Sequence, residues 1–340
     1  MTMNRQVLLK SRPVGIPEAG HFEIVERPLP EIADGELLIR NHFLSVDPAM
    51  RGWVNDAPNY LPPVAIGEVM RSFAVGRVHA SRHPKYREGD LVTGLLGWQE
   101  WAVLPAAQID RKLDDAVFAG LPSSAALGVL GLNGVTAYHA LLEIGRPRPG
   151  DTVVVSSAAG SVGACVGQIA KIAGCRTIGI AGGARKVELC RQTFGFDDAV
   201  DYRDADFPAA LKAACGAGVD LYFDNTSGPI SDAVYALLRL RARVVVCGTV
   251  AYDNWAPPPQ GPRIDRRVLV ARARVEGFIA TDWMHRWDEA VRQLSAWMRE
   301  GRLTHLEEVL DGIEAAPASI AGLYRGENFG KRVIRLASDT

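Results

Sequence analysis

The clearest hydrophobic pattern in the chain lies between Asp151 and Arg185. The β-branched run Thr152–Val155 is too short for a helix and predicts a buried strand. A turn of small residues follows, and apolar residues then recur at helical spacing up to Gly174, where a left-handed helix cap is expected. Because a second apolar run, Thr177–Ile180, predicts another strand, the whole stretch predicts a βαβ unit.

Strand and helix patterns continue to alternate after this unit. Further strands are predicted at Ala199–Asp201, Val219–Phe223, Arg243–Cys247 and Val275–Ile279. Helices are predicted at Lys186–Thr193, Asp206–Cys215, Ile230–Leu238 and Trp283–Arg299. The alternation predicts a doubly wound parallel sheet with ligand contacts at the strand ends. The proline-rich stretch Trp255–Arg263 predicts no regular element, and is either an active-site flap or a linker.

The first part of the chain has a different pattern, typical of a β-rich domain. Short strand patterns are separated by glycine and proline turns, at Val7–Leu9, Glu36–Arg40, Val75–Val78 and Asp90–Thr93. A helical pattern then runs from Ser124 to Leu142, and the tail ends in a strand pattern at Lys331–Leu336 that we expect to rejoin the first domain. The sequence therefore predicts an α/β protein with two domains, residues 1–125 with 305–340 and residues 126–304.

The turn after Val155 carries a nucleotide-binding signal. The pattern Ala158-x-Gly160-x-x-Gly163 is the dinucleotide fingerprint with alanine in the first glycine position. Gly160 lets a pyrophosphate approach the backbone, and Gly163 and Gly167 are expected to let the helix pack closely on the strands. A glycine-rich turn of another α/β protein has the same letters, but the order strand, turn, helix, strand favours cofactor binding.

The end of the second strand indicates which dinucleotide is bound. NAD-binding folds usually have an acidic residue there for the ribose hydroxyls, whereas this chain has Ala181-Gly182-Gly183-Ala184 followed by Arg185 and Lys186. A 2′-phosphate is attracted by these cations, which favours NADP(H). The alternative is that Arg185 and Lys186 are only solvated residues of a first helical turn.

Composition narrows the remaining classes of function. The chain has 340 residues, is 48% apolar and has a formal net charge of −1, which gives no electrostatic argument for nucleic acid or an anionic membrane. No apolar run approaches the length of a membrane span and the first ten residues lack a signal sequence, so we expect a cytoplasmic protein. The cysteines are scattered singly and predict neither disulfides nor a structural zinc site, at Cys165, Cys175, Cys190, Cys215 and Cys247.

Several short motifs together resemble one family over residues 5–336. They are Leu44–Gly52 (LSVDPAMRG), Ile66–Met70, Gly97–Glu100, Gly134–Tyr138, Ala158–Gly167, Tyr222–Asn225 and Asn328–Lys331. In this combination the chain resembles the medium-chain dehydrogenase/reductase superfamily, in its zinc-independent branch of prostaglandin reductases, alkenal/one reductases and plant double-bond reductases. Bacterial NADP-dependent oxidoreductases of this branch are the most similar. The resemblance implies a GroES-like first domain, a Rossmann domain and a homodimer.

The resemblance also implies an activity and a set of contacts. Members of the branch use NADPH to reduce the carbon–carbon double bond of α,β-unsaturated ketones and aldehydes. The pyrophosphate would be held by Gly160, Ser161, Val162 and Gly163, and the 2′-phosphate by Lys186 and Tyr202. Asn225 would lie near the cofactor ribose. Residues implied around the nicotinamide half are Thr136, Cys247, Gly248, Thr249, Val250, Tyr252, Phe278, Ile279, Ala280 and Asn328. As alternatives, Tyr202 is an ordinary strand-end aromatic residue and Asn225 stabilises its own turn.

The expected reaction uses no metal. No cysteine precedes Cys165, and Gly67-Glu68-Val69 stands where the zinc-dependent branch has Gly-His-Glu. The proton donor is less clear, because Ala49 and Val270 replace tyrosines that many relatives have. The phenols that remain in expected pocket segments are Tyr252 and Tyr60. We hypothesise that Tyr252 or the cofactor's 2′-hydroxyl polarises the substrate carbonyl.

Two other functions are compatible with the same motifs. One is an NADPH quinone oxidoreductase, and the other is a non-catalytic NADPH-binding sensor, for which the missing tyrosines are an argument. Oxidation of NADPH by a panel of enones, compared with a panel of quinones, separates these from an enone reductase.

Overall fold

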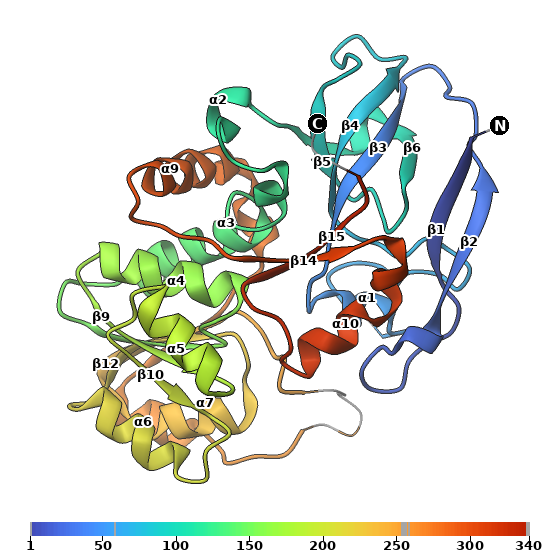
Figure 1. Cartoon of the computed structure of the whole chain (residues 1–340). Helices are drawn as coiled ribbons and strands as arrows, with labels where there is room; N and C mark the ends of the chain where they lie inside the picture. The colour runs from blue at the N-terminus through green and yellow to red at the C-terminus, as the bar shows by residue number, and fades with distance from the viewer. Residues whose placement is uncertain (1, 58, 253–256, 258, 338–340) are drawn as a thin grey trace. The chain divides into compact units, whose positions relative to one another are not determined.

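The chain folds into two compact units, seen in a computed structural model that describes all residues except 1, 58, 253–256, 258 and 338–340. One unit consists of Met1–Leu127 with Glu307–Thr340, and the other of Gly128–Leu306 (Figure 1). The first unit is rich in β-strands and the second contains a parallel sheet with helices, which confirms the predicted α/β fold class. Among the described residues, none of the helices combines the length and the apolar composition that crossing a bilayer requires.

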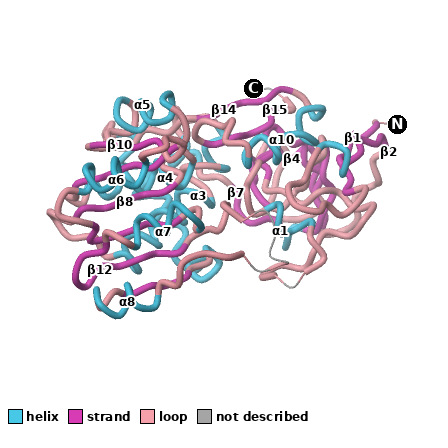
Figure 2. The backbone as a smooth tube through the Cα atoms, turned by 90° about the horizontal axis from the view of Figure 1, so that it is seen from below, coloured by secondary structure: helices cyan, strands magenta, loops and turns pink. Residues whose placement is uncertain are grey.

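The sheet of the second unit has the doubly wound arrangement. Over the described residues its strand order is β10-β9-β8-β11-β12-β13, and all neighbouring strands are parallel (Figure 2). The strands are β8 (Thr152–Ser156), β9 (Arg176–Ala181), β10 (Asp198–Asp201), β11 (Val219–Asp224), β12 (Leu238–Val246) and β13 (Arg274–Gly277). Chain connections run in one direction from β8 to β10 and in the other from β11 to β13. The order therefore reverses between β8 and β11, where such folds place a ligand.

Helices cover this sheet and one another. They are α3 (Leu132–His139), α4 (Ser161–Ile172), α5 (Ala184–Gln192), α6 (Phe207–Cys215), α7 (Gly228–Tyr235), α8 (Asp265–Ala271) and α9 (Trp287–Arg299). Helices α6, α7 and α8 enclose an apolar core with the strands, formed around Val154, Tyr222 and Val244. Helix α4 packs on β8 and β9, and α3 packs on both α4 and α9. Right-handed crossovers account for this layering.

Some predicted elements differ from the structure where glycines or a bulge intervene. The helical pattern from Ser124 to Leu142 is broken into the 3₁₀ turn η3 (Ser123–Leu127), α3 and the π-helix η4 (Ala140–Gly145). The break lies at Gly128, whose carbonyl accepts hydrogen bonds from the amides of Gly131 and Gly134 at 3.1 and 3.0 Å.

Three further boundaries and one missing helix need correction. The helix predicted to reach Leu238 ends at Tyr235, because Leu238 already pairs with Val219 in β12 and a bulge follows before Arg243. The helix predicted from Trp283 is preceded by the 3₁₀ helix η5 (Ala280–Arg286) and begins at Trp287. The last parallel strand ends at Gly277 rather than at Ile279. Helix α8 was not predicted, and residues 255, 256 and 258 of the proline-rich stretch lie outside the described residues.

The strands of the first unit pair antiparallel, except that β14 runs parallel to β15. Over the described residues, one sheet has the order β14-β15-β3-β4-β5-β7, with β6 also paired to β3, and β1 pairs with β2 separately. The strands are β1 (Met3–Leu9), β2 (Phe22–Pro28), β3 (Glu36–Ser45), β4 (Ala74–Ser81), β5 (Leu91–Gly94), β6 (Trp101–Pro105), β7 (Ile109–Lys112), β14 (Glu307–Asp311) and β15 (Lys331–Arg335). The helices are α1 (Met50–Val54), α2 (Asp115–Phe118) and α10 (Ala316–Tyr324), with the 3₁₀ turns η1 (Ala19–His21), η2 (Ala106–Gln108) and η6 (Ile313–Ala315).

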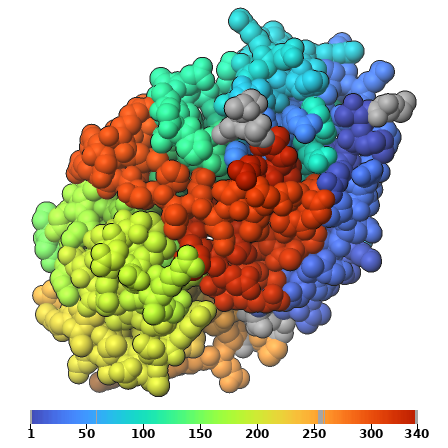
Figure 3. Space-filling view, in the orientation of Figure 1, coloured from blue at the N-terminus to red at the C-terminus, as the bar shows by residue number. Residues whose placement is uncertain are grey.

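The end of the chain completes the first unit. Strand β15 lies antiparallel to β3, and the C-terminal and N-terminal stretches of this unit lie side by side in Figure 3. The buried ammonium of Lys331 pairs with Asp47 at 2.6 Å and donates to Ser45 Oγ at 2.7 Å. Since both members of the pair are less than a tenth exposed, the last strand is joined to the start of the Asp47–Gly52 motif by a fully enclosed ion pair.

Gly163 and Gly167, the two glycines in the fingerprint helix, allow close contact with different parts of the unit. A Cβ on Gly163 would overlap the carbonyl of Ser157 in the turn. A Cβ on Gly167 would overlap the ring of Phe196, which lies in the loop between α5 and β10. The expectation that Gly167 packs on a strand is therefore wrong, because an aromatic ring from a later loop takes the space.

We expect Gly167→Ala to lower the free energy of unfolding by about 1–3 kcal/mol, because the added methyl group overpacks against Phe196. Urea denaturation measures the loss, and Gly167→Ala combined with Phe196→Leu should recover part of it. Gly277→Ala is the matched control, because nothing lies within 4 Å of the added Cβ. An equal loss in the control would contradict the overpacking explanation.

Candidate functional site

The turn between β8 and α4 forms an anion-binding geometry at the switch point. Ser157 has a left-handed backbone with φ 51°, and Gly160 caps α4 without a side-chain hydrogen bond. The amides of Ser161, Val162 and Gly163 are in the first turn of the helix, where no intrahelical acceptor exists. A Cβ on Gly160 would lie only 3.1–3.2 Å from Ser157 oxygens. The turn therefore presents bare amides that a phosphate can approach closely.

Asp224, at the carboxyl end of β11, is the polar centre of this region. Its carboxylate is 2% exposed and accepts hydrogen bonds from the Thr226 and Ser227 amides at 3.0 and 2.7 Å. It also accepts from the hydroxyls of Ser231 at 2.7 Å and Tyr222 at 3.0 Å. Burial, and next the Asp224 carboxylate, raise the pKa of the Tyr222 phenol well above its usual value, so this phenol stays a donor.

The same centre holds Asn225 against the end of β8. The backbone amide of Asn225 donates to Ser156 Oγ at 2.8 Å. The side-chain Nδ2 of Asn225 donates to the Ser156 carbonyl at 2.7 Å. The alternative in which Asn225 only stabilises its own turn is thus wrong, because both contacts cross to a neighbouring strand. Asn225 and the Gly160 turn are consequently fixed to one another through the last residue of β8.

The loop after β12 lies along the residues that follow Asp224. The amides of Cys247 and Gly248 donate to the Asp224 carbonyl at 2.8 and 3.1 Å, and a Cβ on Gly248 would lie 2.7 Å from the Asn225 carbonyl. Further along, the Ala251 amide donates to the Thr226 carbonyl at 2.8 Å. The segment from Cys247 through Thr249 and Val250 to Tyr252 therefore lies beside the residues that follow Asp224, with Gly248 next to Asn225 and Ala251 next to Thr226. Burial raises the pKa of the Cys247 thiol to about 12, so it is not a nucleophile at neutral pH.

The ends of β9 and β10 form a second polar group. The ring of Tyr202 lies so close to the backbone of Gly182 that a Cβ there would be 2.8 Å from it. The guanidinium of Arg203 lies 5.8 Å from the centre of the Tyr202 ring, and 3.7 Å from where Gly183 would have its Cβ. Lys186 is in the first turn of α5, with its amide bonded to the Gly183 carbonyl at 3.0 Å. Two glycines, the Tyr202 phenol and the Arg203 guanidinium thus lie at one turn, and Lys186 is in the first turn of the helix that follows it.

Other predicted site residues lie on separate elements. Thr136 is 8% exposed in α3, and Phe278, Ile279 and Ala280 follow β13, with Ile279 40% exposed. Tyr60 and Asn328 belong to the first unit. Tyr60 is 48% exposed and its hydroxyl accepts from Trp53 Nε1 at 3.3 Å, while the Asn328 side chain donates to the Gly330 carbonyl at 3.2 Å.

Comparisons with known proteins agree with this arrangement. Residues 5–111 match the model of an N-terminal domain of oxidoreductases, and residues 161–296 match that of a zinc-binding dehydrogenase domain. The chain is 44% identical to an NADPH-dependent curcumin reductase of Escherichia coli (strain K12), over 99% of this chain and 98% of that protein. It is 34% identical to a 2-alkenal reductase (NADP(+)-dependent) of Nicotiana tabacum, over 99% and 98%.

A solved structure is similar over the same length. The crystal structure of CurA from Vibrio vulnificus in complex with NADPH superimposes with a TM-score of 0.92 at 40% identity, covering 98% of this chain and 99% of that chain. The chain belongs to the medium-chain dehydrogenase/reductase superfamily. Within this superfamily it falls in the branch of alkenal/one and prostaglandin reductases, as the motifs predicted, and it is an oxidoreductase.

Ala49 and Val270, where the resemblance implied tyrosines, lie on different elements. Ala49 precedes α1 and packs partly buried against the core of the first unit, whereas Val270 is on α8 with its side chain 60% exposed. Neither side chain can donate a proton. Among the residues that the structure describes, no group of three or more histidine, cysteine or acidic side chains is arranged to hold a metal ion.

Two further residues of the candidate site were not predicted from the sequence. Arg203 was passed over, although it directly follows Tyr202 and adds a third cation near the Gly182 turn. Asp224 was quoted only as a motif letter, although it organises Ser156, Asn225 and the Cys247 loop. An acidic residue at the end of an otherwise apolar strand, next to Asn225, was the available signal.

Proposed function

We propose that this chain uses NADPH to reduce the carbon–carbon double bond of α,β-unsaturated ketones and aldehydes. The observation that carries the proposal is the bare helix turn at the switch point, combined with the cationic, glycine-lined turn at the ends of β9 and β10. The names of the similar curcumin and alkenal reductases, and the NADPH-bound CurA structure, support the same choice. The cytoplasmic location expected from the sequence stays a prediction.

The residues present fit this cofactor. Ser161, Val162 and Gly163 bind the pyrophosphate through their backbone amides. Gly160, whose own amide donates to the Ser157 carbonyl at 3.0 Å, contributes by its lack of a side chain, which leaves room for the close approach. At the other end, Lys186, Arg203 and the Tyr202 hydroxyl bind the 2′-phosphate. The sequence of the turn itself, from Ala181 to Ala184, has no acidic residue, which distinguishes it from a turn that binds an unphosphorylated ribose.

The remaining predicted contacts belong to the nicotinamide half of the cofactor. Asn225 lies beside the ribose, and the Cys247–Tyr252 loop covers one side, with Gly248, Thr249 and Val250 as its middle residues. The other contacts are proposed for Thr136, Phe278, Ile279, Ala280 and Asn328. The support for this assignment within the second unit is that Asn225 and the Cys247–Tyr252 loop are already packed against one another.

The protein's part in the chemistry is orientation and hydrogen bonding. NADPH, when bound, supplies a hydride to the β-carbon of the conjugated double bond. Negative charge then gathers on the substrate's carbonyl oxygen, and a fixed donor at that oxygen lowers the barrier. We assign this donor to the Tyr252 hydroxyl, on the loop held by Asp224 and Thr226. The cofactor's 2′-hydroxyl is the alternative donor.

Tyr60 is the second phenol available to the reaction. Burial of part of its ring raises the pKa of the Tyr60 hydroxyl, so it is protonated at neutral pH. Because this oxygen accepts its hydrogen bond from Trp53, its own proton remains available for donation. We assign Tyr60 a secondary role on the substrate side.

We also propose a homodimer formed through the edge strand β13. All four residues of β13 are exposed, and so are the apolar side chains of Leu269 (72%) and Val270 (60%) on the preceding helix. An unpaired edge with adjoining apolar surface favours addition of another strand. A two-fold axis at Val275 pairs Arg274 with Glu276 of the second copy, and the reverse, so the edge complements itself.

Removal of the cations near the Gly182 turn should abolish the preference for the phosphorylated coenzyme. We expect Lys186→Ala and Arg203→Ala each to weaken NADPH binding about tenfold or more, because a hydrogen bond to a charged group contributes about 1.5–3 kcal/mol. NADH binding should stay the same. Fluorescence titration measures both, with Arg191→Ala as the control, since that arginine is on α5 but pairs with Asp198. Equal affinity of the native protein for NADPH and NADH would contradict the assignment.

Loss of the Tyr252 hydroxyl should slow the reaction without loosening the cofactor. For Tyr252→Phe we expect kcat for enone reduction to fall about 100-fold, the lower end for a positioned acid, with unchanged NADPH affinity. Tyr60→Phe should reduce kcat less. Stopped-flow oxidation of NADPH on an enone panel, with a quinone panel in parallel, gives both values. Unchanged turnover of Tyr252→Phe would assign the donor to the cofactor's 2′-hydroxyl, and faster reduction of quinones would replace the enone assignment.

Charge reversal on β13 tests the dimer. Glu276→Lys should shift the protein to a monomer, because it places two cations opposite each other across the two-fold axis. The double variant Arg274→Glu with Glu276→Lys should restore the dimer by exchanging the pair. Sedimentation velocity distinguishes the species. A native protein that sediments as a monomer, or a Glu276→Lys variant that remains dimeric, would refute this interface.

A further inference from the structure

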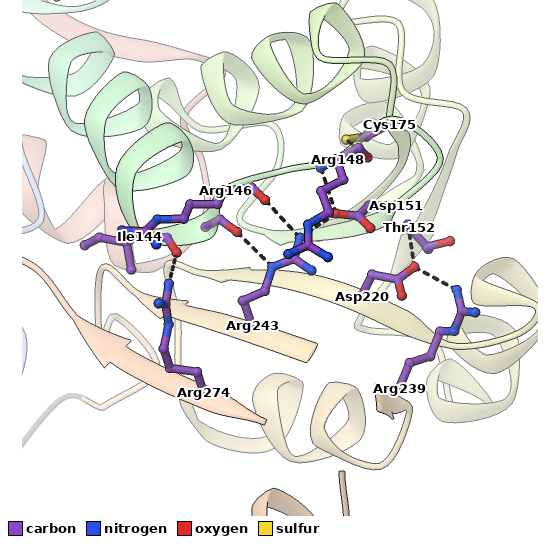
Figure 4. Close-up of polar contacts among 11 residues, drawn as sticks. Ile144, Arg146, Arg148, Asp151, Thr152, Cys175, Asp220, Arg239, Arg243 and Arg274 are labelled. Carbon is purple, nitrogen blue, oxygen red and sulfur yellow. Dashed lines mark hydrogen bonds and ion pairs between the residues drawn. The ribbon is translucent and has the colours of Figure 1, made fainter. Parts of the chain in front are cut away.

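The helix that carries Thr136 ends in an unusual way at the amino edge of the parallel sheet. Helix α3 continues into the π-helix η4, and Arg146 terminates it in a left-handed conformation with φ 48°. The last carbonyls of a helix have no intrahelical donor, and they carry the negative end of the helix dipole. Three consecutive ones, those of Ile144, Gly145 and Arg146, are instead bound by arginine side chains from β12 and β13 (Figure 4).

Arg243 of β12 makes the central contacts. Its Nε donates to the Gly145 carbonyl at 2.9 Å, and its Nη2 donates to the Arg146 carbonyl at 3.2 Å and pairs with the Asp151 carboxylate. The side chains of Arg243 and Asp151 are only 15% and 14% exposed. Because the same Asp151 oxygen accepts the Arg148 amide at 2.8 Å, the guanidinium joins β12, the helix end and the start of β8.

Arg274 repeats this contact from the edge strand. Its Nη2 donates to the Ile144 carbonyl, while its Nε lies 3.4 Å from Glu276 on its own strand. All four residues of β13 are exposed, so this strand is held in the sheet by its ladder with β12 and by this side chain. The nearby pair Arg239–Asp220, at 2.9 Å, touches no helix carbonyl and serves as a comparison (Figure 4).

The helix end is also closely packed. A Cβ on Gly145 would lie 2.8 Å from Leu221 and 3.5 Å from Val245, so the helix end packs directly on β11 and β12 beside the Arg243 contacts. The three elements gathered here each lead to a proposed nicotinamide contact at the opposite edge. Helix α3 carries Thr136, β12 leads into Cys247, and β13 leads into Phe278.

The geometry points to Arg243 and Arg274 as positioning residues for the nicotinamide half of the site. They fix where α3 stands relative to the ends of β12 and β13, and so the spacing between Thr136, the Cys247 loop and Phe278. The adenosine half depends on β9, β10 and α5, which neither arginine touches. This inference rests on the cofactor site given in the proposed function.

A lysine cannot replace either arginine in this role. The guanidinium of Arg243 reaches two carbonyls and a carboxylate at fixed angles, and that of Arg274 reaches one carbonyl and one carboxylate. An ammonium is a single point of charge on a flexible stem. Arg243→Lys and Arg274→Lys therefore keep the charge, and with it the proposed Arg274–Glu276 pairing between copies, but lose the geometry.

The test compares two ligands that share only the adenosine half. NADPH and 2′,5′-ADP are titrated into the native protein and into Arg243→Lys, Arg274→Lys and the control Arg239→Lys. We expect both variants to bind NADPH at least fivefold more weakly, with 2′,5′-ADP affinity within twofold of the native value and the control unchanged for both ligands. The near-ultraviolet spectrum and the fluorescence of bound NADPH should change in the same two variants.

Each contrary result overturns the inference in a distinguishable way. Parallel losses for NADPH and 2′,5′-ADP would make the arginines merely structural, and unchanged NADPH affinity in both variants would remove their positioning role. If Arg243→Lys fails to fold, the variant of the more exposed arginine, Arg274→Lys, decides. The same comparison applies, the loss of NADPH affinity against the loss of 2′,5′-ADP affinity. A native protein that binds neither ligand would instead refute the proposed function, and the inference with it.

Discussion

A buried carboxylate requires hydrogen-bond donors, and in this protein that requirement assembles the centre of the parallel-sheet unit. Asp224 is 2% exposed, so leaving its oxygens unsatisfied would cost several kcal/mol. Its donors come from β8, β11 and α7, and its own carbonyl receives the amides of the loop after β12. Elements distant in the sequence thus meet at one point, beside the turn that opens α4.

Local sequence rules predicted the parts of the fold that local forces decide. Short β-branched and apolar runs predicted β8 and β9 to within one residue at each end, and Gly174 has the positive φ of 80° that a left-handed helix cap needs. They failed where a distant contact decides. No residue near Gly167 in the sequence predicts that the Phe196 ring packs against it. The pairing of Leu238 with Val219 depends on a bulge that is defined only by the neighbouring strand.

The residues of the candidate site likewise fall into those that local sequence predicts and those that depend on distant contacts. The Gly160 turn could be found from the sequence because its function depends on backbone geometry that glycines encode directly. Asp224 carries a weaker signal, an acidic residue at the end of an apolar strand, but its contacts could not be predicted because they come from strands that meet only in the folded unit. The position of Arg203 depends on the Tyr202 ring that lies against Gly182, which no local pattern encodes. The roles of Tyr60 and Tyr252 stay predictions, because a phenol's function depends on what stands opposite its hydroxyl.

The position of β15 has a consequence for how the protein is made. Lys331 completes a buried pair with Asp47, so the core of the first unit cannot close until residue 331 has left the ribosome. The unit formed by Gly128–Leu306 is continuous and can fold earlier in translation. Nascent chains that stall before residue 331 will therefore carry a finished parallel-sheet unit attached to an unclosed β-sheet, a form that invites chaperone binding.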